Sequence, residues 1–469
     1  MNHPFPSGFL WGAATAAHQV EGNNHNNQWW AWEQTPGHIY QNQRPGLACN
    51  WWAPGGAEAD FDLAQALGQN AHRLSVEWSR LEPVEGEFDA AAFGRYREML
   101  GALRSRGLTP MVTLHHFTNP LWFEEQGAWL NPRSVALFQR FAERVAVELG
   151  DLVDLWCTIN EPNVHAMLSY LLGEHPPGLR SMAAPFRVMR HLLLGHAAAY
   201  RAIHRLDGRA QVGLVLHFRP FVPATASARL DQWAAAVQNY LFSDCLLTAI
   251  QDGILRPPLG RGQTVGPLID SSDFIGVNFY TRELVRFDLR APGNLFGQRF
   301  LAPSGETSDL MSSGLAYSEL APDSLERLLL RLATIGKPIF ITECGLPDAD
   351  DDQRARFLIT HLAAVQRALQ AGAPIKGFFH WTLVDNFEWA EGWLLRFGLI
   401  ELDRDTQARR PRPSARTYAD ICRANAISAA VVQRDAPEVF EQIFGRRPDS
   451  PLRLAAEEIA MQERAAARA

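Results

Sequence analysis

Short apolar runs that alternate with longer amphipathic stretches constrain the fold of this chain more than any other feature. Eight of the runs have the length and composition of strands. Most are continuously hydrophobic, as parallel strands are when helices cover them. The eight runs are Phe9–Ala17, Ala71–Trp78, Thr109–Phe117, Leu155–Pro162, Gln211–Phe218, Asp273–Tyr280, Pro338–Gly345 and Ile375–Thr382.

Helical patterns fall between these runs. Apolar residues three to four positions apart predict helices over Phe93–Arg106, Ser134–Leu149, Met189–Leu206 and Asp352–Ala371. Gly107 follows the first of them as a stop signal. Strand-then-helix units repeated in this way indicate an α/β fold, a (β/α)₈ TIM barrel.

The chain divides into two parts by composition. No linker rich in Ser or Gly interrupts residues 1–425, and α/β barrels are long enough to take up that length as one domain. Residues 426–469 lack strand signals and end in a sequence rich in Ala, Glu and Arg. We predict a barrel domain over 1–425 and a helical or partly disordered C-terminal extension over 426–469, whose Arg residues form a solvated helix face.

Bulk properties exclude several classes of function. The formal net charge of −7 argues against a nucleic-acid or anionic-membrane binder. No apolar run approaches the ~20 residues of a membrane span, and residues 1–6 lack the pattern of a signal peptide. The five cysteines are scattered singly, which predicts reduced thiols and a cytoplasmic location without zinc or disulfides. Nothing in the sequence indicates an oligomeric state.

Two of the predicted strands end in the same way. One leads into Asn160-Glu161-Pro162 and the other into Glu343-Cys344-Gly345. Chemistry in such barrels lies at the C-terminal ends of the strands, so both carboxylates are expected on one face. Paired carboxylates at close range perform glycoside hydrolysis. A lone Glu at a strand end is more often a capping or salt-bridged group.

The other strand ends carry acceptors, donors and aromatic rings. They include Gln19, Arg73, His116, Asn278, Tyr280, Trp381, Glu388 and Trp389. Such a rim suits an uncharged, polyhydroxylated ligand. A phosphate site needs a Gly-rich loop with Lys, and a nucleotide site needs GxGxxG after a strand; neither occurs. The acidic run Asp348–Asp352 lacks the Gly and terminal Glu of a calcium loop and is predicted to be a solvated helix start.

These segments resemble glycoside hydrolase family 1, the β-glucosidase and β-galactosidase family. The resemblance rests on Phe9–Thr15, Gln19–Gly22, His72–Arg80, Thr158–Asn163, Gly276–Tyr280, Ile341–Gly345 and Trp381–Trp389, which occur in family order. Each string alone is a weak signal. Together they are specific, and they fall on the predicted strand ends.

The resemblance implies a retaining mechanism in which Glu343 is the nucleophile and Glu161 the general acid/base. Retention needs two carboxyl groups roughly 5–5.5 Å apart, with pKa values pushed apart by their surroundings. Arg73 is the natural partner that keeps Glu343 ionised, and Tyr280 can donate a hydrogen bond to the same carboxylate. Glu161 has no cation beside it in the sequence, so we expect its pKa to be raised.

The resemblance also implies a set of sugar-binding residues. They are Gln19, His116, Asn160, Trp381, Glu388 and Trp389. Barrel packing for the two Trp residues and a core role for His116 stay open as alternatives. Family members that act on 6-phosphorylated glycosides lack an acid at the position of Glu388. A carboxylate there would repel a phosphate, which favours unphosphorylated sugars.

Three positions depart from the family pattern. Cys344 stands where Asn is usual, and we expect a packed, inert thiol. Phe117 replaces a Trp, which removes one possible hydrogen bond to the sugar. Phe279 stands where Tyr is common, although Tyr280 still supplies a hydroxyl. These changes bear on substrate preference more than on the chemistry.

The expected protein is an exo-acting β-glucosidase with β-galactosidase or β-fucosidase side activity. Its partners would be small-molecule β-glycosides or short oligosaccharides, with no cofactor and no metal. A transglycosylase that uses the same two Glu residues with an acceptor sugar or alcohol is the main alternative. A non-catalytic sugar-binding barrel is disfavoured because both Glu161 and Glu343 are present. A metal-dependent isomerase is disfavoured because no Asp/His/Glu metal cluster is apparent.

Overall fold

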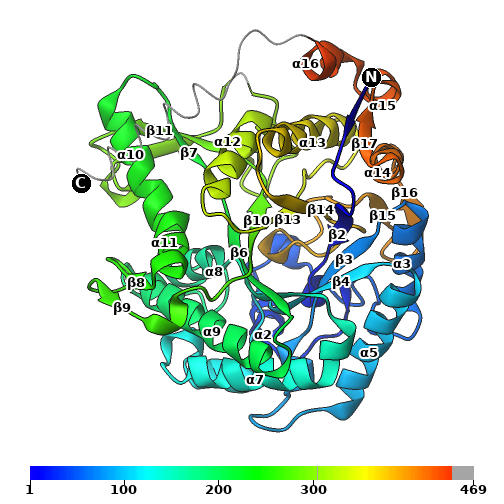
Figure 1. Cartoon of the computed structure of the whole chain (residues 1–469). Coiled ribbons are helices and arrows are strands. Elements are labelled where there is room, and N and C mark those ends of the chain that lie inside the picture. The colour runs from blue at the N-terminus through cyan, green and yellow to red at the C-terminus, as the bar shows by residue number, and fades with distance from the viewer. Residues whose placement is uncertain (304, 446–469) are drawn as a thin grey trace.

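The computed structural model describes residues 1–303 and 305–445. Parallel strands close into a central barrel in the order β10-β13-β14-β2-β3-β4-β5-β6 (Figure 1). The strands are β2 (Leu10–Ala14), β3 (Ala71–Ser75), β4 (Thr109–His115), β5 (Leu155–Asn160), β6 (Gln211–His217), β10 (Phe274–Phe279), β13 (Ile339–Cys344) and β14 (Ile375–Trp381). The predicted TIM barrel and its eight strands are confirmed.

The order of strands around the barrel is the order in the chain. Closure occurs where β14 pairs with β2, with Gly377 opposite Leu10. The predicted runs extend beyond several strands because the residues after them already turn into the site. Glu77, for example, caps the short helix that follows β3 and has left the sheet. The carboxyl ends of all eight strands therefore face the same side of the molecule.

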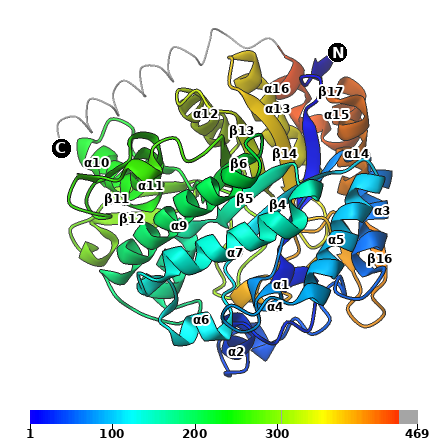
Figure 2. The same ribbon diagram turned by 60° about the horizontal axis from the view of Figure 1, so that its bottom comes forward.

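Helices follow the strands and cover the outside of the barrel (Figures 1 and 2). They are α3 (Gly56–Ala66), α5 (Ala90–Ser105), α7 (Ser134–Leu149), α9 (Ala184–Leu206), α11 (Cys245–Asp252), α12 (Pro322–Ala333), α13 (Arg354–Gln370) and α14 (Pro413–Ala424). Helix α10 (Arg229–Asn239) packs instead against residues 221–223 and 283–287, outside the barrel. The four predicted helices are present, and α7 has the predicted bounds. Helix α5 begins before the apolar pattern does, because Asp89 Oδ1 accepts from the N–H of Ala91 and of Ala92 as an N-cap.

Smaller elements connect the strands and helices of the barrel. The short helices are α1 (Ala17–Val20), α2 (Gln28–Glu33), α4 (Trp78–Leu81), α6 (Leu121–Glu125) and α8 (Pro162–Met167). A side sheet contains β7 (Phe221–Pro223), β11 (Glu283–Phe287) and β12 (Gly297–Phe300). Two hairpin pairs are β8 (Ile254–Leu255) with β9 (Gln263–Thr264), and β15 (Ile400–Leu402) with β16 (Arg409–Pro411). Single turns of 3₁₀ or π helix lie at 40–42, 128–130, 150–152, 168–172, 240–244, 266–268, 292–294, 389–391 and 437–439.

The segment after the barrel packs against the N-terminus. Strand β17 (Ala426–Ser428) pairs antiparallel with β1 (Asn2–Pro4), a strand that the sequence did not suggest. Helices α15 (Ala429–Asp435) and α16 (Phe440–Phe444) follow it. The boundary after residue 425 stays a prediction, and residues 446–469 of the predicted extension lie outside the described residues. Within the part of the chain that the structure describes, no helix is long and apolar enough to cross a membrane.

Candidate active site

Arg73 lies at the centre of the site and joins the ends of several strands. Its Nη1 donates to Glu343 Oε1 at 2.5 Å and to the Thr342 carbonyl at 3.2 Å. Its Nη2 donates to Asn160 Oδ1 at 2.7 Å, and its Nε to Thr113 Oγ1 at 3.1 Å. The guanidinium is fully buried, so each of these bonds replaces a contact with water. The pairing of Arg73 with Glu343 that the sequence suggested is present.

Glu343, at the end of β13, is held by both carboxyl oxygens. Tyr280, which follows β10, donates its hydroxyl to Glu343 Oε2 at 2.5 Å, while Arg73 holds Oε1. Burial raises the pKa of the Glu343 carboxyl to about 7; the Arg73 cation opposes this rise and the nearby Glu161 carboxyl adds to it. The two donors therefore favour the ionised form of Glu343, but burial still leaves its pKa above the usual range of a carboxyl.

Glu161 follows β5 on a backbone with positive φ (47°), a region that residues other than Gly seldom adopt. Pro162 begins α8 directly after it. Its Oε1 accepts from Asn278 Nδ2 at 2.7 Å, and His217 Nδ1 lies 3.0 Å from the same oxygen. Strained positions of this kind cluster at functional sites, where the surrounding structure enforces them.

The expectation of a raised pKa for Glu161 is wrong. Burial raises the pKa of this carboxyl, but His217, Asn278 and Arg73 outweigh burial, and the pKa lies below its usual range. The expectation failed because it considered only neighbours in the sequence, whereas His217 approaches from the adjacent barrel strand β6.

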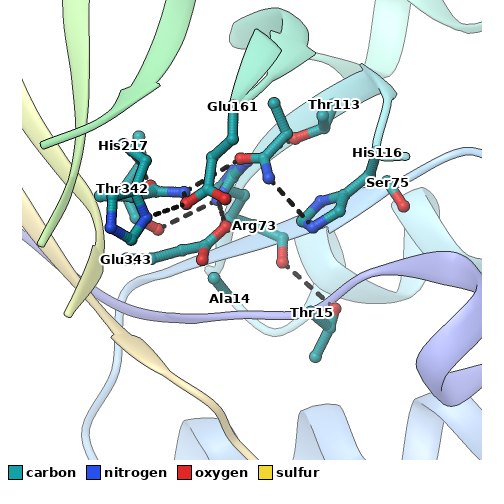
Figure 3. Close-up of polar contacts among 12 residues, drawn as sticks. Ala14, Thr15, Arg73, Ser75, Thr113, His116, Glu161, His217, Thr342 and Glu343 are labelled. Carbon is teal, nitrogen blue, oxygen red and sulfur yellow. Dashed lines mark hydrogen bonds and ion pairs between the residues drawn. The ribbon is translucent and has the colours of Figure 1, made fainter. Parts of the chain in front are cut away.

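The side chains of Glu161 and Glu343 come from different strands and extend toward one another beside Arg73 (Figure 3). Their charges act on each other, so their protons belong to the pair rather than to either residue. Such a pair can attack an electrophilic carbon with one member while the other transfers a proton. The structure thus brings together Glu161, Glu343, Arg73 and Tyr280 as the sequence suggested.

The Glu388 carboxyl is expected to be protonated at neutral pH. Burial and the neighbouring Glu343 charge raise its pKa to about 8, although Trp381 and Gln19 donate hydrogen bonds to it. Gln19 Nε2 lies 3.2 Å from Glu388 Oε2 and also donates to the Phe387 carbonyl at 2.8 Å. The repulsion of a phosphate by a carboxylate at this position, assumed from the sequence, is therefore weakened.

Aromatic rings flank this group. His116 stacks with Trp381 at 6.0 Å and with Trp389 at 6.1 Å between ring centroids. Asn160 Nδ2 donates to His116 Nε2 at 3.1 Å, and burial holds the pKa of His116 well below its ordinary value. Among the sequence-predicted binding residues, His116, Asn160 and both tryptophans therefore form one neutral wall. His115 instead bonds Asn119 at 2.9 Å, away from this wall.

The three departures from the family pattern have structural explanations. Burial raises the pKa of the Cys344 thiol, and the residue is fully enclosed. Phe279 is buried on the outer side of β10, where its ring lies 6.1 Å from that of His361. Phe117 has a φ of 69° and packs against Trp389 at 5.1 Å, so its ring extends the aromatic wall without a polar group.

Sequence reasoning missed two side chains of the site. His217 ends β6, and no motif marks it. Tyr317 lies in the segment 305–321, and its ring centroid is 5.9 Å from that of Tyr280. Burial and the Glu388 carboxyl raise the pKa of the Tyr317 hydroxyl. A polar residue at the end of β6 was the one available signal for His217, because catalytic residues in such barrels lie at the C-terminal ends of strands.

The acidic run after β13 lies before the first residue of α13, and its first member, Asp348, is buried rather than solvated as the sequence predicted. Asp348 Oδ2 accepts from the N–H of Gln353 and of Arg354, where α13 begins. The carboxyl oxygens of Asp348, Asp350 and Asp352 lie within 4.8 Å of one another, but the second and third are exposed. Exposed acidic groups of this kind are common without a metal, and we assign no metal to them.

Comparison with known proteins identifies close relatives over most of the chain. The model of glycosyl hydrolase family 1 matches residues 1–427. The thermostable β-glucosidase B of Thermobispora bispora is 34% identical over 449 residues, covering 90% of this chain and 91% of that protein. The β-galactosidase of Pyrococcus woesei is 30% identical over 508 residues, covering 91% and 98%. The structure of a β-glycosidase from Pyrococcus horikoshii has a TM-score of 0.84 at 38% identity and covers 93% of this chain and 98% of its own.

Proposed function

The chain belongs to glycosyl hydrolase family 1 and is an O-glycosyl hydrolase of the β-glucosidase type, and from this premise we propose that it removes terminal unphosphorylated β-D-glucosyl groups with retention of configuration. We assign Glu343 as the nucleophile and Glu161 as the general acid/base. β-Galactosides and β-fucosides are the proposed secondary substrates, and the cytoplasm is the proposed location.

The observation that carries this proposal is the different way in which the two carboxyls are held. Arg73 and Tyr280 occupy both oxygens of Glu343, which fixes the group and stabilises its negative charge. Asn278 and His217 both approach Oε1 of Glu161. One carboxyl is thus fixed for attack, while the second has an oxygen to use for proton transfer.

The reaction proceeds in two displacements. Glu343 attacks the anomeric carbon as the bond to the leaving oxygen breaks, and Glu161 gives its proton to that oxygen. The product is a covalent glycosyl-enzyme. Glu161, now ionised, takes a proton from water, whose oxygen attacks the anomeric carbon and releases Glu343. Two inversions give net retention.

Substrate binding must place the shared proton on Glu161. Burial raises the pKa of Glu343, while His217 and Asn278 help to lower that of Glu161. A glycosidic oxygen near Glu161 accepts a hydrogen bond only from the protonated form, and sugar hydroxyls near Glu343 donate more strongly to its ionised form. Both contacts favour the arrangement that the first displacement needs.

Recognition of the sugar falls to neutral groups. A protonated Glu388 can donate to one hydroxyl and accept from another, and the Gln19 amide beside it can do the same. A site with such groups discriminates strongly against a substrate that leaves them unpaired. The groups that shift the pKa of Glu388 are the carboxyls of Glu343 and Glu161, the Gln19 amide and the Trp381 indole. None of these four groups is a cation that could bind a 6-phosphate.

The test uses nitrophenyl β-glycosides with wild type, Glu343→Gly and Glu161→Gly, each with and without azide. We expect azide to rescue Glu343→Gly with an α-glycosyl azide as product and Glu161→Gly with a β-glycosyl azide. Glu125→Gly, on the exposed end of α6, is the matched control and should keep wild-type activity. Full activity of Glu343→Gly without azide would overturn the proposal. An added alcohol reveals transglycosylation as alkyl glycoside.

A further inference from the structure

His217 lies at the end of β6 beside the Glu161 carboxyl. Its Nδ1 is 3.0 Å from Glu161 Oε1, and the two side chains are 6% and 7% exposed. Because both groups are buried, the interaction is weakly screened, and an Nδ1–H donated to this oxygen favours an ionised Glu161. We infer that His217 is a positioning residue for the general acid/base, which holds Glu161 by one oxygen and limits the pH range over which Glu161 keeps its proton. This inference rests on the proposed function.

The structure fixes the His217 ring in place. The ring stacks on Tyr280 at 5.7 Å with an interplanar angle of 17°, and Phe242 meets it edge-on at 5.8 Å. Asn163, two residues beyond Glu161, donates its Nδ2 to the His217 carbonyl at 2.8 Å. The end of β6 is thereby tied to the segment that carries Glu161, and the imidazole has little freedom to leave the carboxyl.

The hydrogen bonds also assign roles to the two oxygens of Glu161. Asn278 Nδ2 and His217 Nδ1 both approach Oε1, at 2.7 and 3.0 Å. Among the described residues, no hydrogen bond to Oε2 is found. A carboxyl held in this way presents Oε2 to the substrate, and its proton must reside on Oε2 when it acts as an acid.

Other charged or titratable groups also act on Glu161. They are Arg73 on β3, Tyr280 after β10, Glu343 on β13, Tyr317 within 305–321 and Glu388 after β14. Arg73 makes its hydrogen bonds to Glu343 and Asn160 rather than to Glu161. Replacing His217 therefore alters the surroundings of Glu161 without removing a direct contact of Glu343.

The sign of the effect follows from the contact. A donor to a carboxylate favours the ionised form, so its removal lets Glu161 keep its proton to higher pH. In His217→Phe, which keeps an aromatic ring on Tyr280, we expect the alkaline limb of the kcat/KM profile to move upward by about 1 pH unit or more. His217→Asn retains an amide that can donate, and its limb should lie between those of wild type and His217→Phe.

Two substrates separate this role from a purely structural one. Alkyl glucosides need a proton from Glu161, whereas 2,4-dinitrophenyl glucoside leaves without one. We expect the shift in the alkaline limb for the alkyl substrate only, because loss of packing alone would lower kcat/KM for both. His204→Asn is the matched control: His204 pairs with Asp273 at 2.9 Å near the start of β10, at the opposite end of the barrel, and its replacement should leave both profiles unchanged.

The outcomes distinguish this inference from the proposed function. If wild type and Glu161→Gln hydrolyse alkyl glucosides equally well, the assignment of Glu161 fails. If Glu161→Gln loses that activity but both His217 variants retain the wild-type alkaline limb, the role of His217 alone is refuted. Circular dichroism and thermal unfolding show whether His217→Phe folds. If it does not, the alkaline limb of the His217→Asn profile decides whether His217 has the inferred role.

Discussion

Arg73 and Glu343 form a buried ion pair, 2.5 Å between Nη1 and Oε1, that connects β3 to β13 past two intervening barrel strands. Two buried charges gain stability only when their remaining hydrogen-bonding groups are also satisfied. The guanidinium meets that condition by donating to Thr342, Asn160 and Thr113. The Tyr280 hydroxyl donates to the other oxygen of the Glu343 carboxylate. The contact fixes the position of the nucleophile and favours its negative charge.

Replacing Arg73 by Met should lower kcat/KM at pH 7 by about 10²-fold or more, because a buried carboxylate without its cation is disfavoured by several kcal/mol. The pKa of Glu343, already raised to about 7, should rise further, so the acid limb of the pH profile moves upward. Arg95→Met is the control, since Arg95 pairs with Glu58 away from the site. A kcat/KM for Arg73→Met within threefold of wild type would contradict the role of this pair.

Tyr280→Phe removes the donor to Glu343 Oε2 while keeping the ring. We expect kcat/KM to fall about 10-fold to 10²-fold, as loss of a hydrogen bond to a charged group costs about 1.5–3 kcal/mol. The acid limb should shift upward for the same reason as in the Arg73 variant. Tyr200→Phe, which removes a hydroxyl bonded to Asp273 at 2.9 Å, provides the control. An unaltered pH profile in Tyr280→Phe would argue against its contact with the nucleophile.

Glu388 offers a test that depends on pH. Because its pKa is raised to about 8, the side chain is neutral at pH 6, and Glu388→Gln should resemble wild type there within about 10-fold. Glu388→Ala should lose about 10²-fold or more, since it leaves sugar hydroxyls unpaired. The wild-type rate should diverge from that of the Gln variant as pH rises through 8. Equal losses for Gln and Ala at pH 6 would show that protonation of Glu388 is irrelevant.

The cysteines should be inert in the folded protein. All five, Cys344 beside the nucleophile included, are buried, and burial raises the pKa of the Cys344 thiol, which removes the reactive thiolate. Iodoacetamide should leave activity unchanged and modify no cysteine until denaturant is added, as followed by mass spectrometry. Stoichiometric alkylation of Cys344 in the native state, with loss of activity, would show that the thiol is accessible.

The barrel and its two Glu residues could be predicted because their signals are local. Parallel strands covered by helices are continuously hydrophobic, and a carboxylate at the end of such a run has no packing role. Helix ends were less predictable where a cap lies outside the apolar pattern, as with Asp89 before α5. Strand β17, paired with β1 in only three positions, is too short to leave a periodic signal.

The contact between His217 and Glu161 could not be predicted, because it depends on how β5 and β6 are aligned. That alignment contains an irregularity between Cys157 and Asn160, which the sequence does not reveal. The direction of each pKa shift could not be predicted from the sequence either. It depends on burial and on the sum of charges brought together by several strands, as the contrast between Glu161 and Glu388 illustrates.

The central claim is that Glu343 forms a covalent glycosyl-enzyme. Its most direct test is to trap that species with 2,4-dinitrophenyl 2-deoxy-2-fluoro-β-D-glucoside and to locate the label by peptide mass spectrometry. We predict one label per chain on the peptide that contains Glu343, an α-linkage to its carboxyl, and no label in Glu343→Gln. A label on any other residue, or turnover of β-glucosides to α-glucose without a trapped intermediate, would contradict the account.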